Sequence, residues 1–186
     1  GRLREYYTWG VEPRLKLDHN FLGVNSNLDF GFRAHFETQD RRQINLNQPN
    51  VAQNGLVESN IRETQAYSWF LTNRFNLGQF TVTPGIRYEY IDFQRKNKLN
   101  GVSGNDHLDM WLPSLGLTWN PSSLVTLFAG SHRGFAPPRT EDVINGVGTS
   151  TDVGAEKSVN WEVGARSRPL EWIDLQAAFF RNDFQK

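Results

Sequence analysis

The chain has 186 residues, with 20 Lys plus Arg against 20 Asp plus Glu, a formal net charge of zero and no cysteine. The balanced charge gives no support for nucleic-acid binding, and the lack of cysteine excludes a disulfide scaffold and a thiolate metal site. The mean hydropathy is -0.58, and no apolar run approaches the ~18 residues of a membrane-spanning helix. A soluble β-sandwich and a transmembrane β-wall, in which only every second residue is apolar, both stay open.

Apolar and polar side chains alternate with a period of two along most of the chain, which is typical of strands with one apolar and one polar face. Near the N-terminus, for example, Phe30 and Phe32 alternate with Arg33 and His35. The pattern predicts about eight strands in one domain or part of one. These strands are centred on residues 4–18, 27–37, 67–77, 80–90, 111–119, 124–132, 160–166 and 173–179.

Two features complicate these strands. Pro13, Pro84 and Pro113 lie within the strand patterns, and because proline cannot donate to a ladder we expect strand ends or bulges there. In residues 124–132 the two faces stay unassigned, because Leu127 and Phe128 are adjacent apolar residues.

Short and long connections alternate along the chain. Tight turns are predicted near residues 20–26, 76–79, 120–123 and 168–171, and long polar loops at 39–63, 95–108 and 135–156. Outer-membrane barrels place short turns on the periplasmic side and long loops outside, whereas soluble sandwiches mix lengths at both ends. The spacing therefore favours an all-β fold, an antiparallel transmembrane β-barrel segment.

The segment from Gly130 to Asp142 carries the candidate ligand-binding residues His132, Arg133 and Arg139. Guanidinium groups bind carboxylates with two parallel hydrogen bonds, so the two arginines suit an anionic ligand. The alternative is an ion pair with Glu141 or Asp142 within the loop, and a histidine exposed to water.

Catalytic and metal sites are not predicted. Ser131 and His132 could suggest a hydrolase, but adjacent residues of a strand point to opposite faces and are poorly placed as nucleophile and base. The four histidines are scattered and form no spaced metal motif.

Three stretches carry a family resemblance: GSHRGFAPPRTEDV, AEKSVNWEVGARSRP and LQAAFFRNDFQ. They resemble TonB-dependent outer-membrane receptors, in which a Gly-Phe-x-x-Pro junction precedes a Glu-x-Ser-x-Asn-x-Glu-x-Gly strand. The matching residues here are Gly134, Phe135, Pro138, Glu156, Ser158, Asn160, Glu162 and Gly164. GFAPPR and RAHFETQDRRQIN are most similar to the ferric dicitrate receptor branch.

The resemblance implies a 22-stranded barrel with an N-terminal plug domain, in a bacterial outer membrane. Residues 1–186 would be part of the barrel domain, without the plug and the barrel ends, and with open edges that are unstable in lipid. We expect no autonomous function for such a segment. Eight charged or polar side chains would face the lumen and mostly contact the plug or water: Arg33, His35, Glu37, Arg74, Arg87, Glu89, Glu162 and Arg166.

The function implied is TonB-dependent active import of a ferric chelate, such as ferric citrate or another siderophore. The implied partners are the chelate, the TonB complex acting through the plug, and outer-membrane lipid. No resident cofactor is expected, because the iron arrives already chelated. The alternatives are a passive porin-like channel, a barrel enzyme and a soluble carbohydrate-binding sandwich.

Overall fold

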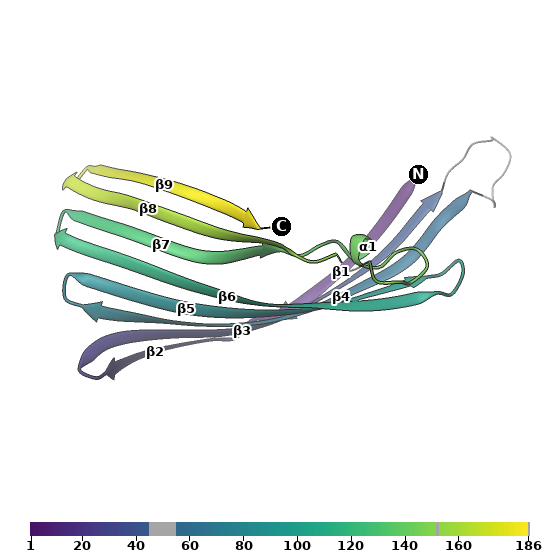
Figure 1. The fold of residues 1–186 in the computed structure, drawn as a ribbon, viewed down its shortest axis with the longest axis horizontal. Coiled ribbons are helices and arrows are strands. Elements are labelled where there is room, and N and C mark those ends of the chain that lie inside the picture. Colours follow the sequence, from purple (N-terminus) through teal and green to yellow (C-terminus); the bar gives the residue numbers. More distant parts are fainter. Residues whose placement is uncertain (45–54, 152, 186) are drawn as a thin grey trace.

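The computed structural model describes residues 1–44, 55–151 and 153–185, which form one antiparallel sheet with a single four-residue helix (Figure 1). The elements are β1 (Arg2–Val11), β2 (Arg14–Phe21), β3 (Val24–Ile44), β4 (Leu56–Leu77), β5 (Phe80–Asn97), β6 (Ser103–Ser122), β7 (Val125–Ala136), α1 (Thr140–Val143), β8 (Glu156–Leu170) and β9 (Ile173–Gln185). The all-β class predicted from the alternation is confirmed.

Nine strands are present in the described residues, but the sheet is eight strands wide. Both β1 and β2 pair with β3, β1 along residues 34–43 and β2 along residues 24–31. Pro13 interrupts them, and its carbonyl accepts a hydrogen bond from Phe32 N at 3.1 Å. The two therefore act as one broken edge strand, and the order across the sheet is β1/β2-β3-β4-β5-β6-β7-β8-β9.

The other two prolines also lie where a ladder breaks. The β4–β5 register passes from Thr72↔Gly85 to Phe75↔Val82, omitting Pro84. The β6–β7 pairing ends at Ser114↔His132, directly beside Pro113. Each proline thus occupies a position where no amide is needed for a ladder hydrogen bond.

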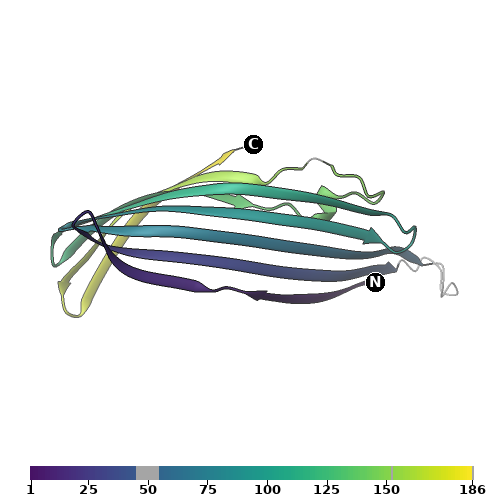
Figure 2. The same cartoon turned by 90° about the horizontal axis from the view of Figure 1, so that it is seen from below.

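Two-residue turns join the strands at one end of the sheet, and longer connections lie at the other end (Figures 1 and 2). In the turn between β2 and β3, Leu22 and Gly23 have φ of 50° and 84°, as a type I′ hairpin turn requires. The opposite end carries residues 98–102 and the segment 137–155 that contains α1. The predicted alternation of short and long connections is confirmed.

Two of the predicted long loops are largely strand. The expected loop 39–63 is wrong at both ends, because β3 continues to Ile44 and β4 begins at Leu56; residues 45–54 lie outside the described residues. The expected loop 95–108 shrinks to 98–102. Ladder hydrogen bonds use only the backbone, so they continue beyond the apolar zone, where most residues on both faces are polar and the alternation is too weak to mark a strand.

One face of the sheet is apolar from the middle of the strands to the short turns. Large side chains there stay accessible, including Trp9 at 62% and Trp161 at 52% of their surface. Neighbouring rings contact one another, with ring centroids 5.2 Å apart for Trp69 and Trp111 and 4.8 Å apart for Tyr88 and Trp111. A continuous exposed apolar and aromatic face of this kind is typical of a surface that meets lipid or another protein.

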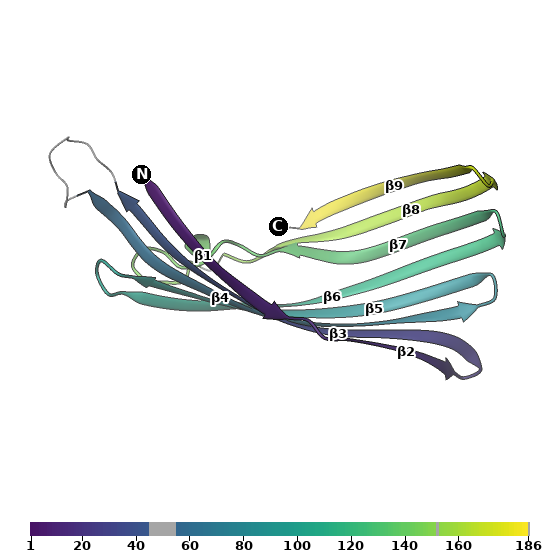
Figure 3. The same cartoon turned by 180° about the vertical axis from the view of Figure 1, so that it is seen from behind.

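The opposite face is polar and carries α1, which lies over the sheet in Figures 1 and 3. The small core of the described residues is here, where Val143 and Ile144 pack against Ile91 and Phe93 of β5. No helix among the described residues is long and apolar enough to span a membrane.

Candidate functional site

The segment 137–155 places α1 against the wall of the sheet. Ile144 is completely buried, and its carbonyl accepts a hydrogen bond from Arg95 Nη1 at 2.7 Å. Within the segment, Thr151 N donates to Val143 O at 2.8 Å. An apolar contact and backbone hydrogen bonds therefore fix the position of α1, and with it the position of Glu141.

Arginines from adjacent strands lie side by side beneath α1. Gln39 of β3 pairs with Arg62 of β4, and Arg62 pairs in turn with Arg95 of β5. Arg41 lies two residues beyond Gln39 on the same face. Like charges on directly opposite strand positions repel each other, so this group of guanidinium groups requires acidic partners.

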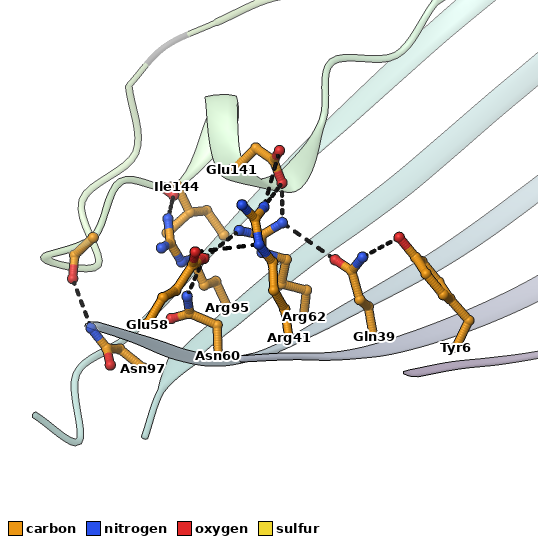
Figure 4. Close-up of polar contacts among 11 residues, drawn as sticks. Tyr6, Gln39, Arg41, Glu58, Asn60, Arg62, Arg95, Asn97, Glu141 and Ile144 are labelled. Carbon is orange, nitrogen blue, oxygen red and sulfur yellow. Dashed lines mark hydrogen bonds and ion pairs between the residues drawn. The ribbon is translucent and has the colours of Figure 1, made fainter. Parts of the chain in front are cut away.

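Two glutamates supply those partners (Figure 4). Glu58 lies 3.1 Å from Arg62 Nη2 and 3.3 Å from Arg41 Nε. Glu141 of α1 forms a short ion pair with Arg62 Nη1 and lies 3.4 Å from Arg41 Nη1. The arginine cluster therefore consists of Arg41, Arg62 and Arg95 with Glu58 and Glu141. Three positive charges against two negative charges leave it with a net charge of +1.

Arg62 is the most deeply buried member of the cluster, with 5% of its side chain exposed. Burial lowers its pKa, and the charge of Glu141 opposes that shift. The guanidinium still keeps its proton, because an arginine side chain stays protonated at any pH at which the protein works. Gln39 Oε1 accepts a further hydrogen bond from Arg62 Nη1 at 3.3 Å, and Gln39 Nε2 in turn donates to Tyr6 Oη.

The cluster retains unused hydrogen-bonding capacity. Within the described part of the chain, Nε of Arg62 and Nε of Arg95 are buried and have no hydrogen-bond acceptor. A buried donor without a partner costs about 1–3 kcal/mol. Such donors are the groups that an additional anionic ligand would satisfy.

A groove of ≈ 460 Å³ opens beside the cluster on the polar face, between the wall and α1. Its charged lining consists of four arginines and two glutamates, together with one histidine: Arg4, Arg41, Arg62, Arg139, Glu37, Glu141 and His35. Apolar side chains, among them Phe93 and Pro138, complete it. Guanidinium groups from four different segments converge on one space, an arrangement that suits a ligand with several carboxylates.

The structure separates the three residues expected to bind a ligand. Arg139 lines the groove. His132 lies on the polar face but pairs with Asn160, 3.1 Å from its Nε2. Arg133, by contrast, lies in register with Val159 on the apolar face, where it borders a separate hollow with Trp111. The faces that the sequence left unassigned in β7 are thereby resolved.

The alternative ion pairs expected for these arginines are not the ones observed. Glu141 pairs with Arg41 and Arg62, and neither Arg133 nor Arg139 lies within ion-pair distance of a carboxylate among the described residues. Arg4, Arg41 and Arg62 also line the groove and were not predicted from the sequence. The signal for Arg41 was present, because the alternation through His35 and Glu37 continues to Gln39 and Arg41.

The register places the eight residues expected to face a lumen on one face of the sheet, the face that carries α1. They are Arg33, His35, Glu37, Arg74, Arg87, Glu89, Glu162 and Arg166. Two of them, His35 and Glu37, line the groove, and Arg87 forms a short ion pair with Glu89. Their contact with a cargo stays a prediction.

The structure also places the Ser131–His132 pair and tests for a metal-binding group in the described residues. Ser131 and His132 lie on opposite faces of β7, in register with Trp161 and Asn160. Over residues 1–44, 55–151 and 153–185, no group of three or more histidine, aspartate or glutamate side chains could hold a metal ion.

The sequence profile of one family, described as TonB dependent receptor-like, beta-barrel, matches residues 1–186, the whole chain. The chain belongs to this family. TonB-dependent receptor barrels are outer-membrane proteins of Gram-negative bacteria, and the family consists of receptors and transporters.

Solved structures of siderophore receptors share the fold. The unliganded ferric citrate transporter FecA superimposes with a TM-score of 0.85 at 20% identity, over 98% of this chain and 28% of its own. The alcaligin receptor FauA from Bordetella pertussis gives 0.76 at 16% identity, over 98% and 30%. The ferric-catecholate receptor Fiu from E. coli K12 in its closed form gives 0.77 at 14%, over 97% and 32%. The chain thus spans about a third or less of the length of these proteins, and the shared property is the barrel fold.

Proposed function

We propose that this chain forms part of the barrel wall of an outer-membrane receptor that imports a ferric chelate by TonB-dependent active transport. The groove beside α1 contacts the anionic groups of the chelate. The observation that carries this proposal is the convergence of Arg4, Arg41, Arg62 and Arg139 on one groove beside buried guanidinium donors that lack acceptors.

Ferric citrate is the first cargo to test. Its carboxylates match guanidinium geometry, and the resemblance of the sequence and the likeness to the ferric citrate transporter FecA point in the same direction. The iron is part of this cargo and is not a resident cofactor. The TonB complex would act through a plug domain of the whole receptor, and the apolar face would meet outer-membrane lipid.

Arg139 and Arg133 provide a matched pair for testing the groove in the whole receptor. Changing Arg139 to Ala should weaken ferric citrate binding about 10- to 140-fold, because a hydrogen bond to a charged group contributes about 1.5–3 kcal/mol. Changing Arg133 to Ala should leave the affinity unchanged, because this side chain lies on the other face. Titration of the purified receptor measures both. Equal effects of the two substitutions, or no effect of Arg139→Ala, would contradict the proposed site.

The transport step is tested by uptake. Cells that carry the receptor should accumulate radioactive iron supplied as ferric citrate only when TonB is present. Uptake that continues at the same rate in cells lacking TonB would indicate a passive porin-like channel instead.

A further inference from the structure

We infer that Glu141 is an internal competitor of the cargo: in the empty receptor its carboxylate occupies the anion position between Arg41 and Arg62, and an anionic chelate replaces it on binding. This inference rests on the proposed function of the groove. It adds a mechanism by which the site selects anionic cargo.

The cations and the carboxylate come from different parts of the fold. Arg41 and Arg62 belong to the strands of the wall, where Glu58 and Gln39 hold them independently of α1. Glu141 reaches them from the segment between β7 and β8, across 100 and 79 residues of sequence. Removing its carboxylate would therefore leave the positions of the two guanidinium groups defined by the wall.

Exposure favours exchange at Glu141. Its side chain is 31% exposed and borders the groove, whereas Arg62 is 5% exposed and Glu58 20%. A ligand in the groove therefore reaches the Glu141 carboxylate before it reaches the buried guanidinium. The Glu141 carboxylate is partly exposed and can turn toward the open groove, so its release does not leave a buried charge without a partner.

The charge of the cluster sets the selectivity. With Glu141 in place, the cluster of Arg41, Arg62, Arg95, Glu58 and Glu141 has a net charge of +1. Replacing Glu141 by a chelate with one or more negative charges keeps the buried Arg62 paired with an anion and can satisfy its unused Nε donor. A neutral chelate would leave Arg62 with Glu58 alone, which is unfavourable for a buried cation.

The exchange does not require α1 to leave the wall. Val143 and Ile144 stay packed on Ile91 and Phe93, and the hydrogen bond from Arg95 to the Ile144 carbonyl is on the backbone. The expected movement is therefore a rotation of the Glu141 side chain, with the rest of the segment kept in place.

The test uses the whole receptor and two probes, ferric citrate and a neutral ferric trihydroxamate. Changing Glu141 to Gln removes the competing charge at constant size and should tighten ferric citrate binding roughly tenfold, which corresponds to about 1.4 kcal/mol. Binding of the neutral probe should not become tighter. The matched control is Asp142→Asn, which removes the same charge from the exposed next residue of α1 and should change the affinity less than twofold.

Two outcomes would overturn the inference: unchanged or weaker ferric citrate binding in the Glu141→Gln receptor, and an equal gain in the Asp142→Asn receptor. If the Gln variant does not fold, Glu141→Asp keeps the charge but withdraws the carboxylate, and should give a smaller gain. If the affinity of the Glu141→Asp receptor for ferric citrate is not increased, the inferred competition is likewise contradicted.

A double-mutant cycle with Arg41→Gln separates this inference from the proposed function. If Arg41→Gln weakens ferric citrate binding and abolishes the gain from Glu141→Gln, both are supported. If Arg41→Gln weakens binding but the gain persists, Glu141 acts elsewhere and only the inference fails. If Arg41→Gln has no effect on binding, the groove is not the chelate site and the proposed function fails.

Discussion

Changing Ile144 to Ala should release the segment 137–155 from the wall without unfolding the sheet. Ile144 is completely buried against Ile91 and Phe93, and losing its buried carbon atoms costs about 0.8 kcal/mol per methylene, before a cavity term is added. Typical Ile-to-Ala costs are about 2–5 kcal/mol. This core is a single small cluster on one face of a sheet, so it can collapse readily, and the expected cost is about 2–3 kcal/mol.

The loss should appear as local opening. The ladders of β4 and β5 do not depend on Ile144, so its cost falls on the equilibrium between the docked and undocked segment. A cost of about 2–3 kcal/mol raises the open population about 30- to 140-fold. The amides of Ile144 and Thr151, which donate to Thr140 O and Val143 O, should exchange faster by that factor.

Hydrogen exchange followed by mass spectrometry measures this opening directly. Peptides from residues 137–155 should exchange faster in the Ile144→Ala receptor, and peptides from β5 should not. Val147→Ala is the control from the same segment, because Val147 is 69% exposed. Equal acceleration in β5, or unchanged exchange in 137–155, would refute the argument that this cluster holds the segment.

Two further substitutions test the connections around the site. A Cβ added at Gly104 would lie 2.2 Å from the carbonyl oxygen of Gly148, so Gly104→Ala should displace the segment 137–155 and speed its amide exchange, whereas Gly146→Ala, which meets nothing within 4 Å, should not. Asp40 lies 2.8 Å from Lys98 Nζ, and the hydrogen bond from Lys98 is the main reason why the pKa of Asp40 is lowered. The Asp40 carboxylate therefore contributes its full stabilisation above the ordinary aspartate pKa of about 4. This stabilisation is lost as the pH falls through the lowered pKa. The unfolding temperature of the Asp40→Asn receptor should thus lie below that of the native receptor by a constant amount from pH 7 to about pH 5, and by a shrinking amount below about pH 4. A difference that stays the same down to about pH 2 would refute the stabilising role of the ionised Asp40.

The alternation of apolar and polar residues was sufficient to predict the class of the fold, the width of the sheet and the short turns. It works where one face is apolar, because the side-chain period of two then assigns each residue to a face. Thus Arg33, His35 and Glu37 share the polar face as expected. The prolines at 13, 84 and 113 also marked ladder breaks, because proline lacks the amide hydrogen that a ladder requires.

The extent of the strands was decided by the tertiary structure. Residues 39–44 and 56–63 are mostly polar on both faces, and it is their backbone pairing that makes them strand. Arg41 and Arg62 lie in these extensions, which explains why a loop was predicted where the groove is built.

The composition of the site depends on contacts between residues far apart in sequence. Glu141 forms ion pairs with Arg41 and Arg62, which lie 100 and 79 residues away in sequence. No local sequence pattern specifies such long-range pairs. Local proximity was also misleading for Arg133, which is close to Arg139 in sequence but points away from the groove, because the pleat of β7 sends adjacent side chains to opposite faces. Sequence alone therefore determined which residues could form strands and faces. The folding of segment 137–155 onto β5 determined which charges came together.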